Sequence, residues 1–156
     1  MEPRRQTILI VDDEAPMREL LQETLSGEGY ELLTATDGKD ALKQVLGLRP
    51  DLILLDIRMP KLDGVTLCKA LRVYKETQSI PIIMLTALSS RDRLEECMAA
   101  GADDFVGKPF DVVELRMRVR AMLKLKQVND EVDRLQKYIL TLREMRDEGS
   151  APQSNT

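Results

Sequence analysis

Short apolar runs that do not alternate with polar residues constrain the fold of this chain more than any other feature. The strongest are ILIV (8–11), LILL (52–55) and IPIIML (80–85), and the weaker ones are ELLTA (31–35) and DFV (104–106). Continuous apolar runs are typical of strands that are buried on both faces of a parallel sheet. We therefore expect five strands, each covered on both sides.

Segments with helical periodicity separate these runs. Their apolar residues recur three and four positions apart, at Met17, Leu20, Leu21 and Leu25, at Ala41, Leu42, Val45 and Leu46, at Val65, Cys68 and Leu71, and at Leu94, Cys97 and Met98. Strands alternating with helices predict an α/β fold with helices on both faces of the sheet, because right-handed crossovers return the chain to the same edge each time.

A longer helical pattern follows Asp111. Its apolar residues alternate three and four apart at Ala121, Leu125, Val128, Val132, Leu135, Ile139 and Leu142, with no Pro or Gly before Gly149. This a/d seam predicts a parallel homodimeric coiled coil, since a solvated extension would leave seven apolar positions in water. We expect a compact domain over 1–123, a coiled-coil extension over 124–148 and a disordered tail over 149–156.

Composition excludes several classes of function. The formal net charge of −4 and the pI near 5.0 argue against direct nucleic-acid binding and against an anionic membrane surface. The N-terminal MEPRRQ does not resemble a signal peptide, and no apolar stretch could span a bilayer. Cys68 and Cys97 lack metal-type spacing and predict small buried hydrophobic side chains with reduced thiols. These features favour a cytoplasmic protein.

Basic residues precede the seam, in an order that faintly resembles a basic-region zipper. They are Arg116, Arg118, Arg120, Lys124 and Lys126. The same stretch must also pack Leu115, Val119 and Met122 onto the sheet, so we expect a solvated basic face rather than a free arm that binds DNA.

Polar residues follow the predicted strands at the points where the strands end. They are Asp12 and Asp13, Asp56, Thr86 and Lys108. Loops at the carboxyl ends of parallel strands meet in one crevice, so these side chains are expected to come together. Taken singly, Asp12 could form a turn, Thr86 could cap a helix starting near Ser89, and Lys108 could be a surface charge.

Three carboxylates in one crevice require a cation, because otherwise one of them would take up a proton. A hard divalent ion such as Mg²⁺ fits better than Zn²⁺, since the chain has no His and no paired Cys. Lys108 and Thr86 add a positive charge and a hydroxyl donor, which suit an anion. The set predicts phosphoryl transfer in which Asp56 is the nucleophile and becomes an acyl phosphate.

Four motifs, ILIVDDE, LLDIRMPKLDG, MLTA and GADDFVGKPF, together resemble the receiver domain of two-component response regulators over residues 6 to about 123. The resemblance implies a flavodoxin-like, doubly wound five-stranded sheet and phosphorylation of Asp56 by a sensor histidine kinase or phosphotransfer protein. It also implies that Mg²⁺ is ligated by Asp13, Asp56 and the backbone carbonyl of Arg58, with Asp12 acting partly through water.

The resemblance carries over three further expectations. Thr86 is expected to shift toward the phosphoryl group, and Phe105 to swing inward into the space that it leaves. Phe105 stands where receivers often have Tyr, so a hydrogen bond from that hydroxyl is absent, and plain core packing is its other interpretation. The Lys108–Pro109 bond is expected to be cis.

Three functions remain open at this point. The first is a non-enzymatic phosphoacceptor module that switches dimerisation or partner binding through its last helix. The second is a regulatory piece of a larger output enzyme, such as a diguanylate cyclase. The third is a phosphorylation-independent scaffold, against which the complete set of Asp12, Asp13, Asp56, Thr86 and Lys108 argues.

Overall fold

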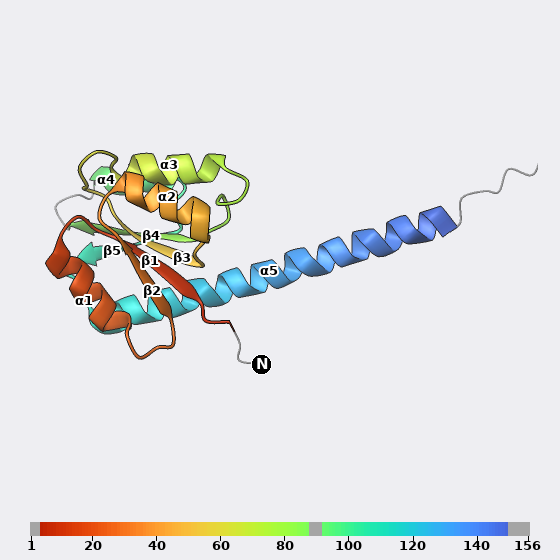
Figure 1. The fold of residues 1–156 in the computed structure, drawn as a ribbon, viewed down its shortest axis with the longest axis horizontal. Coiled ribbons are helices and arrows are strands. Elements are labelled where there is room, and N and C mark those ends of the chain that lie inside the picture. Colours follow the sequence, from red (N-terminus) through yellow and green to blue (C-terminus); the bar gives the residue numbers. More distant parts are fainter. Residues whose placement is uncertain (1–3, 88–91, 150–156) are drawn as a thin grey trace, which may run out of the picture. The chain divides into compact units, whose positions relative to one another are not determined.

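The computed structural model describes residues 4–87 and 92–149, which form a parallel sheet with helices on both faces (Figure 1). The strands are β1 (Thr7–Val11), β2 (Glu31–Ala35), β3 (Leu52–Asp56), β4 (Ile82–Ala87) and β5 (Asp104–Lys108). The helices are α1 (Ala15–Leu25), α2 (Gly38–Leu48), α3 (Gly64–Val73), α4 (Asp92–Ala100) and α5 (Val112–Gly149). The strand order is β2-β1-β3-β4-β5. The predicted flavodoxin-like, doubly wound fold is confirmed.

The sheet separates two hydrophobic clusters. Alternate residues of β3 point to opposite faces, so Ile53 and Leu55 join the cluster under α2, α3 and α4, whereas Leu52 and Leu54 join the cluster under α1 and α5. All four side chains are fully buried. This double burial explains why the strands read as continuous apolar runs.

Side-chain caps set the starts of two helices. Asp37 accepts a hydrogen bond from the backbone N–H of Asp40 at 2.8 Å and begins α2, and Asp63 does the same for the N–H of Thr66 at 2.8 Å and begins α3. Asp63 directly follows the loop after Asp56. The start of α3 is therefore fixed beside the predicted site.

Two details differ from the sequence prediction. Strand β4 begins at Ile82 rather than Ile80, since Pro81 has no N–H to donate to a ladder. Leu20, Leu46 and Met98, which were assigned to apolar helix faces, are 40–47% exposed. They lie at the margins of those faces, where periodicity alone does not indicate how deeply a side chain is buried.

Cys68 and Cys97 are buried and do not form a disulfide bond with each other, as predicted.

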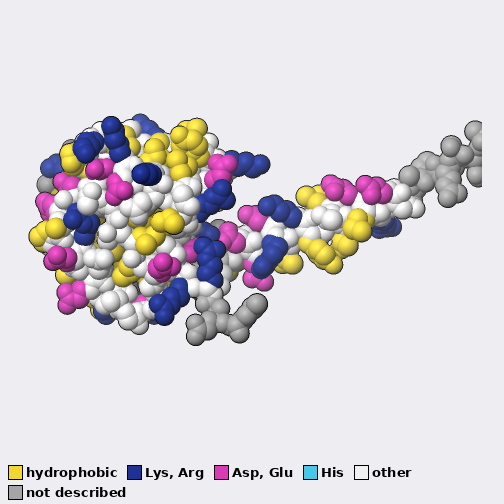
Figure 2. Space-filling model, viewed as in Figure 1, with side chains coloured by type: hydrophobic (Ala, Val, Ile, Leu, Met, Phe, Trp, Pro, Cys, Tyr) yellow, Lys and Arg dark blue, Asp and Glu magenta, His cyan; other side chains and the backbone are white. Residues whose placement is uncertain are grey.

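The chain divides by its internal contacts into the units Met1–Leu123 and Lys124–Thr156. In the second unit, the described residues to Gly149 continue α5, and its seam side chains are 44–54% exposed; they are Leu125, Val128, Val132, Leu135, Ile139 and Leu142. Apolar side chains gather along this part of the helix in Figure 2. The coiled coil stays a prediction. Of the tail predicted over 149–156, Gly149 is the last residue of α5, and residues 150–156 lie outside the described residues.

The basic residues of α5 within the first unit are engaged with neighbouring elements. Arg116 Nε donates to the carbonyl of Thr24 at 2.8 Å, and Arg120 Nη2 lies 3.1 Å from a carboxylate oxygen of Glu28. Arg120 keeps 66% of its side chain exposed, as the predicted solvated face requires, whereas Arg116 is only partly exposed because it packs against the end of α1. No helix among the described residues has the length and apolar character needed to cross a membrane.

Candidate functional site

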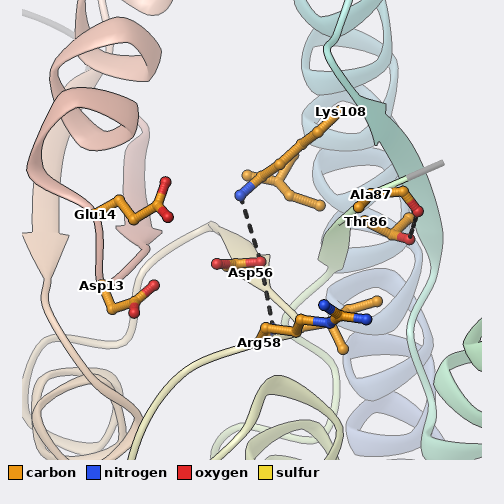
Figure 3. Close-up of a pocket in the computed structure, with 9 residues that line it drawn as sticks. Asp13, Glu14, Asp56, Arg58, Thr86, Ala87 and Lys108 are labelled. Atoms are coloured by element: carbon orange, nitrogen blue, oxygen red, sulfur yellow. Dashed lines mark hydrogen bonds and ion pairs between the residues drawn. The ribbon is translucent and has the colours of Figure 1, made fainter. Parts of the chain in front are cut away.

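Three strand ends deliver the acidic residues and the lysine to one crevice. The register of β1 and β3 pairs Val11 with Leu55, so Asp12 and Asp56 leave neighbouring strands at the same level. At the other side of the crevice, Lys108 ends β5 and reaches back toward Asp56 (Figure 3). The sheet topology thus produces the juxtaposition that the sequence predicts.

The three carboxylates form a compact cluster. One oxygen from each of Asp12, Asp13 and Asp56 lies within 4.8 Å of the others. Asp12 is fully buried and Asp56 is 8% exposed, whereas Asp13 is exposed to solvent. Oxygen ligands on a partly open rim suit a hard divalent cation that keeps some of its water, so the residues present fit Mg²⁺.

Lys108 supplies the positive charge inside the cluster. Its Nζ lies 3.0 Å from Oδ2 of Asp12 and 3.4 Å from Oδ1 of Asp56. Burial works against the ammonium, but the hydrogen bond to Asp12 and the charge of Asp56 outweigh it and raise the pKa of Lys108 above its usual value. The lysine is therefore charged while it faces the predicted nucleophile.

The carboxyl group of Asp56 has a raised pKa. Burial raises its pKa to about 6, against the attraction of Lys108, and the charge of Asp12 adds to the rise. Its Oδ1 also accepts a long hydrogen bond of 3.4 Å from the backbone N–H of Arg58. Without a metal ion, Asp56 is therefore mostly protonated below about pH 6.

The raised pKa of Asp56 predicts a pH-dependent stability. The pKa of this carboxyl is about 6 in the folded chain and 3.8 in the unfolded chain. Its contribution to stability is therefore fully present below pH 3.8, where the group is protonated in both states. The contribution is lost as the pH rises through 6, because the folded chain must then bury a charged carboxylate. In metal-free buffer, Asp56→Asn should therefore raise the free energy of unfolding by about 3 kcal/mol at pH 7.5 and by about 1 kcal/mol at pH 4.5. Urea denaturation at both pH values, with EDTA present, measures this. An equal effect at the two pH values would contradict the assignment.

Thr86 and Arg58 complete the wall of the crevice. Thr86 is buried, and its hydroxyl donates to the carbonyl of Ala87 at 3.0 Å. Both Thr86 and Arg58 line a cavity of about 310 Å³ that also contains Asp56 and Lys108. The crevice has room for a phosphoryl group. The segment that Thr86 could have capped, near Ser89, lies outside the described residues.

Two further predictions concern β5 and its end. The Lys108–Pro109 peptide bond is cis, which confirms the prediction. Phe105 is 40% exposed, so core packing does not describe its position in this structure. Its inward swing, like the shift of Thr86, stays a prediction.

Several residues at the site were not predicted from the sequence. Glu14 lines the cavity, and its backbone N–H donates to Oδ1 of Asp12 at 2.9 Å. Arg18 Nη1 donates to the backbone carbonyl of Asp12 at 2.7 Å. The place of Glu14 at the site could have been predicted, because it directly follows Asp12 and Asp13 in the DDE motif. The contact of Arg18 with the Asp12 carbonyl could not, because it depends on how α1 packs on the sheet.

Comparison with known proteins places these observations in a family. Residues 8–120 match the response regulator receiver domain. The chain is 48% identical over 125 residues to a probable transcriptional regulator, ycf27, of Cyanophora paradoxa, covering 80% of this chain and 51% of that protein. It is 42% identical over 134 residues to the alkaline phosphatase synthesis transcriptional regulatory protein PhoP of Bacillus subtilis, covering 81% and 55%. The chain thus spans about half the length of these relatives.

Solved structures show the same fold. A putative response regulator from Chloroflexus aurantiacus is 40% identical, with a TM-score of 0.75, and the match covers 78% of this chain and 99% of that one. NtrX from Brucella abortus is 31% identical, with a TM-score of 0.77 over 85% of this chain and 30% of that chain. The chemotaxis protein CheY4 of Vibrio cholerae is 34% identical, with a TM-score of 0.72 over 76% and 99%.

Proposed function

Because this chain belongs to the response regulator receiver family, we propose that it accepts a phosphoryl group on Asp56 from a sensor histidine kinase or a phosphotransfer protein. One observation carries the proposal. Asp56 lies at the end of β3 within 3.4 Å of the Lys108 ammonium and inside a cluster of three carboxylates. A buried nucleophile, a fixed cation and an acidic cluster are the parts that phosphoryl transfer to a carboxylate needs.

The chain's own residues account for the proposed reaction. An Asp56 oxygen attacks phosphorus in line as the bond from phosphorus to the donor's histidine nitrogen breaks, and the electron pair of that bond leaves with the imidazole. Meanwhile the Lys108 ammonium pairs with one phosphoryl oxygen, and the Thr86 hydroxyl turns from the Ala87 carbonyl to donate to another. Receiver domains generally bind Mg²⁺ at an acidic pocket of this kind, and the ion neutralises charge on the phosphoryl oxygens. Here Asp12, Asp13, Asp56 and the backbone carbonyl of Arg58 would hold it.

The chain acts in this proposal as a phosphoacceptor and not as an enzyme with a separate substrate. Its relatives are named as regulators. Its chemistry is limited to Mg²⁺-dependent self-phosphorylation and autodephosphorylation, and it works in the cytoplasm. The formal net charge of −4 supports our proposal that these residues do not bind nucleic acid directly, whereas MtrA of Mycobacterium tuberculosis, 43% identical over 124 residues, is named as a DNA-binding response regulator.

Incubation with a small phosphodonor tests the acceptor role. With Mg²⁺ and acetyl phosphate, the purified chain should gain the mass of one phosphoryl group, and hydroxylamine should remove it, since acyl phosphates react with this nucleophile. EDTA should prevent the gain. A chain that gains no phosphoryl group from any donor would leave the scaffold function as the better explanation.

The last helix is the proposed output of the module. Its seam places Leu125, Val132 and Ile139 at a positions and Val128, Leu135 and Leu142 at d positions. β-branched residues at a with Leu at d favour parallel two-stranded coils, and four of these six positions follow that rule. We propose that a second copy of the chain covers the seam, and that phosphorylation switches this dimerisation or the binding of a partner.

Leu135→Asp should weaken the dimer by about 100-fold or more, because it places a charge in the middle of the proposed seam. Leu140→Asp is the matched control, since it makes the same change on the same helix at a b position that is 55% exposed. Sedimentation velocity, with and without beryllium fluoride as a phosphoryl mimic, measures both variants. Equal masses for Leu135→Asp and the unmodified chain would refute the homodimer.

The alternative is that this chain regulates a longer output protein. It is favoured by the relatives named as transcriptional regulators, of which the chain covers about half. In that case the helix connects the receiver to the output part, and phosphorylation of Asp56 is unchanged as the input. The sedimentation experiment separates these two functions. A helix that dimerises as the output should self-associate at micromolar protein concentration, whereas a helix that only connects the receiver to an output part need not.

A further inference from the structure

A second hollow lies beside the acceptor cavity. It has a volume of about 420 Å³, and its lining residues are Asp13, Arg58, Met59, Pro60, Asp63 and Arg93. Asp13 and Arg58 also line the acceptor cavity, so the two spaces share a wall. The second hollow thus adjoins the cavity in which the phosphoryl group of a donor would lie.

Arg93 of α4 supplies a positive charge to this hollow. The reaction proposed at Asp56 gives this residue no role. Its Nη2 lies 3.4 Å from Asp63, and its Nε lies 3.4 Å from Glu96. Both contacts are long for charged hydrogen bonds, which are usually about 2.7–2.9 Å. Among the described residues, Nη1 of Arg93 has no hydrogen-bond partner.

The carboxylate of Asp63 is already shared. Its Oδ1 accepts from the N–H of Thr66 as the cap of α3, and only Oδ2 faces Arg93. The Arg93 side chain is 29% exposed, so a small anion can reach the guanidinium from solvent. The arrangement leaves a positively charged group with spare donors at the rim of the hollow.

We infer that Arg93 determines phosphodonor specificity, and that its guanidinium stabilises the carboxylate released from an acyl phosphate. This inference rests on the proposed function of Asp56. An Asp56 oxygen forms the new bond to phosphorus while the bond from phosphorus to the acyl oxygen breaks. The electron pair of that bond leaves with the carboxylate, so no proton or further reactant is needed. Negative charge therefore develops on the leaving group, where Arg93 can act on it.

Donors with neutral leaving groups provide the internal comparison. Phosphoramidate releases ammonia, which carries no negative charge, and its phosphoryl group would meet the same Asp56 and Lys108. Arg93 should thus accelerate transfer from acetyl phosphate and have little effect on transfer from phosphoramidate. The ratio of the two rates isolates the leaving group from any change in the acceptor cavity.

The test measures initial rates of phosphoryl uptake from both donors, with Mg²⁺, by intact mass. Arg93→Gln should lower the acetyl phosphate to phosphoramidate ratio by about 10-fold. Arg134→Gln, an equal loss of charge at an exposed position of α5, should leave it unchanged. Glu96→Gln removes one partner of Arg93 and should raise the ratio.

An unchanged ratio in Arg93→Gln would overturn the inference while leaving the acceptor function intact. If the ratio stayed the same because both rates fell equally, Arg93 would only support the structure through Asp63 and α4. Failure of the unmodified chain to take up phosphoryl from either donor would instead overturn the proposed function itself.

Discussion

Asp56→Asn is expected to abolish phosphoryl uptake, with a fall in initial rate of more than about 1,000-fold. The amide keeps the size and most contacts of the carboxyl group, but it cannot act as the nucleophile that forms an acyl phosphate. Because Asp56 is 8% exposed and Lys108 keeps its ion pair with Asp12, the neutral side chain should be well tolerated. Intact mass after incubation with acetyl phosphate and Mg²⁺ gives the readout.

Asp133→Asn provides the control for this substitution. Asp133 is exposed on α5 in the second unit, so the same chemical change there should leave uptake unaffected. If Asp56→Asn still gained one phosphoryl group at the normal rate, a different residue would be the acceptor. Peptide mapping of the modified chain would then identify it.

Gly64→Ala is expected to destabilise the fold by about 2–4 kcal/mol, the range of severe overpacking against atoms that cannot move away. A Cβ at this position would lie 2.4 Å from the backbone oxygen of Asp56 and 2.9 Å from Cα of Ile57. Both atoms belong to the backbone, so relief requires a shift of Ile57 and of Asp56, the proposed acceptor. The variant should also take up phosphoryl groups more slowly.

Gly47→Ala is the matched control for Gly64→Ala. Gly47 lies inside α2 with nothing within 4 Å of an added Cβ, so alanine there should stabilise the chain by about 0.5–1 kcal/mol. Urea denaturation of the two variants at pH 7.5 should therefore give changes of opposite sign. Equal stabilities would show that the loop after Asp56 relaxes more easily than its geometry implies.

The sequence predicted the sheet and the acidic crevice because both follow from local patterns. Continuous apolar runs such as LILL report burial on both faces of a sheet, and parallel strands bring residues that follow them to one edge. Asp12, Asp56 and Lys108 could therefore be grouped before any distance was known. Their grouping required only the order of the elements.

The remaining features depend on tertiary packing, which a pattern does not encode. Periodicity assigned Leu20 to the apolar face of α1, but its depth depends on how the helix rolls on the sheet, and the side chain is 43% exposed. The position of Phe105 depends on a rotamer and not on its residue type. Arg93 could not be linked to Asp63 from the sequence, because the two lie 30 residues apart, Asp63 at the N-cap of α3 and Arg93 on α4.

The loop between Asp56 and α3 leaves little freedom on its side of the crevice. Lys61 adopts a left-handed φ of 70°, and the backbone approaches closely at Gly38 and Gly64. If Asp56 is phosphorylated as we propose, this loop leaves the larger side chain little room on its own side. The other side of the crevice holds Thr86, whose hydroxyl makes one hydrogen bond among the described residues, so we expect the structural change that follows phosphorylation to occur there.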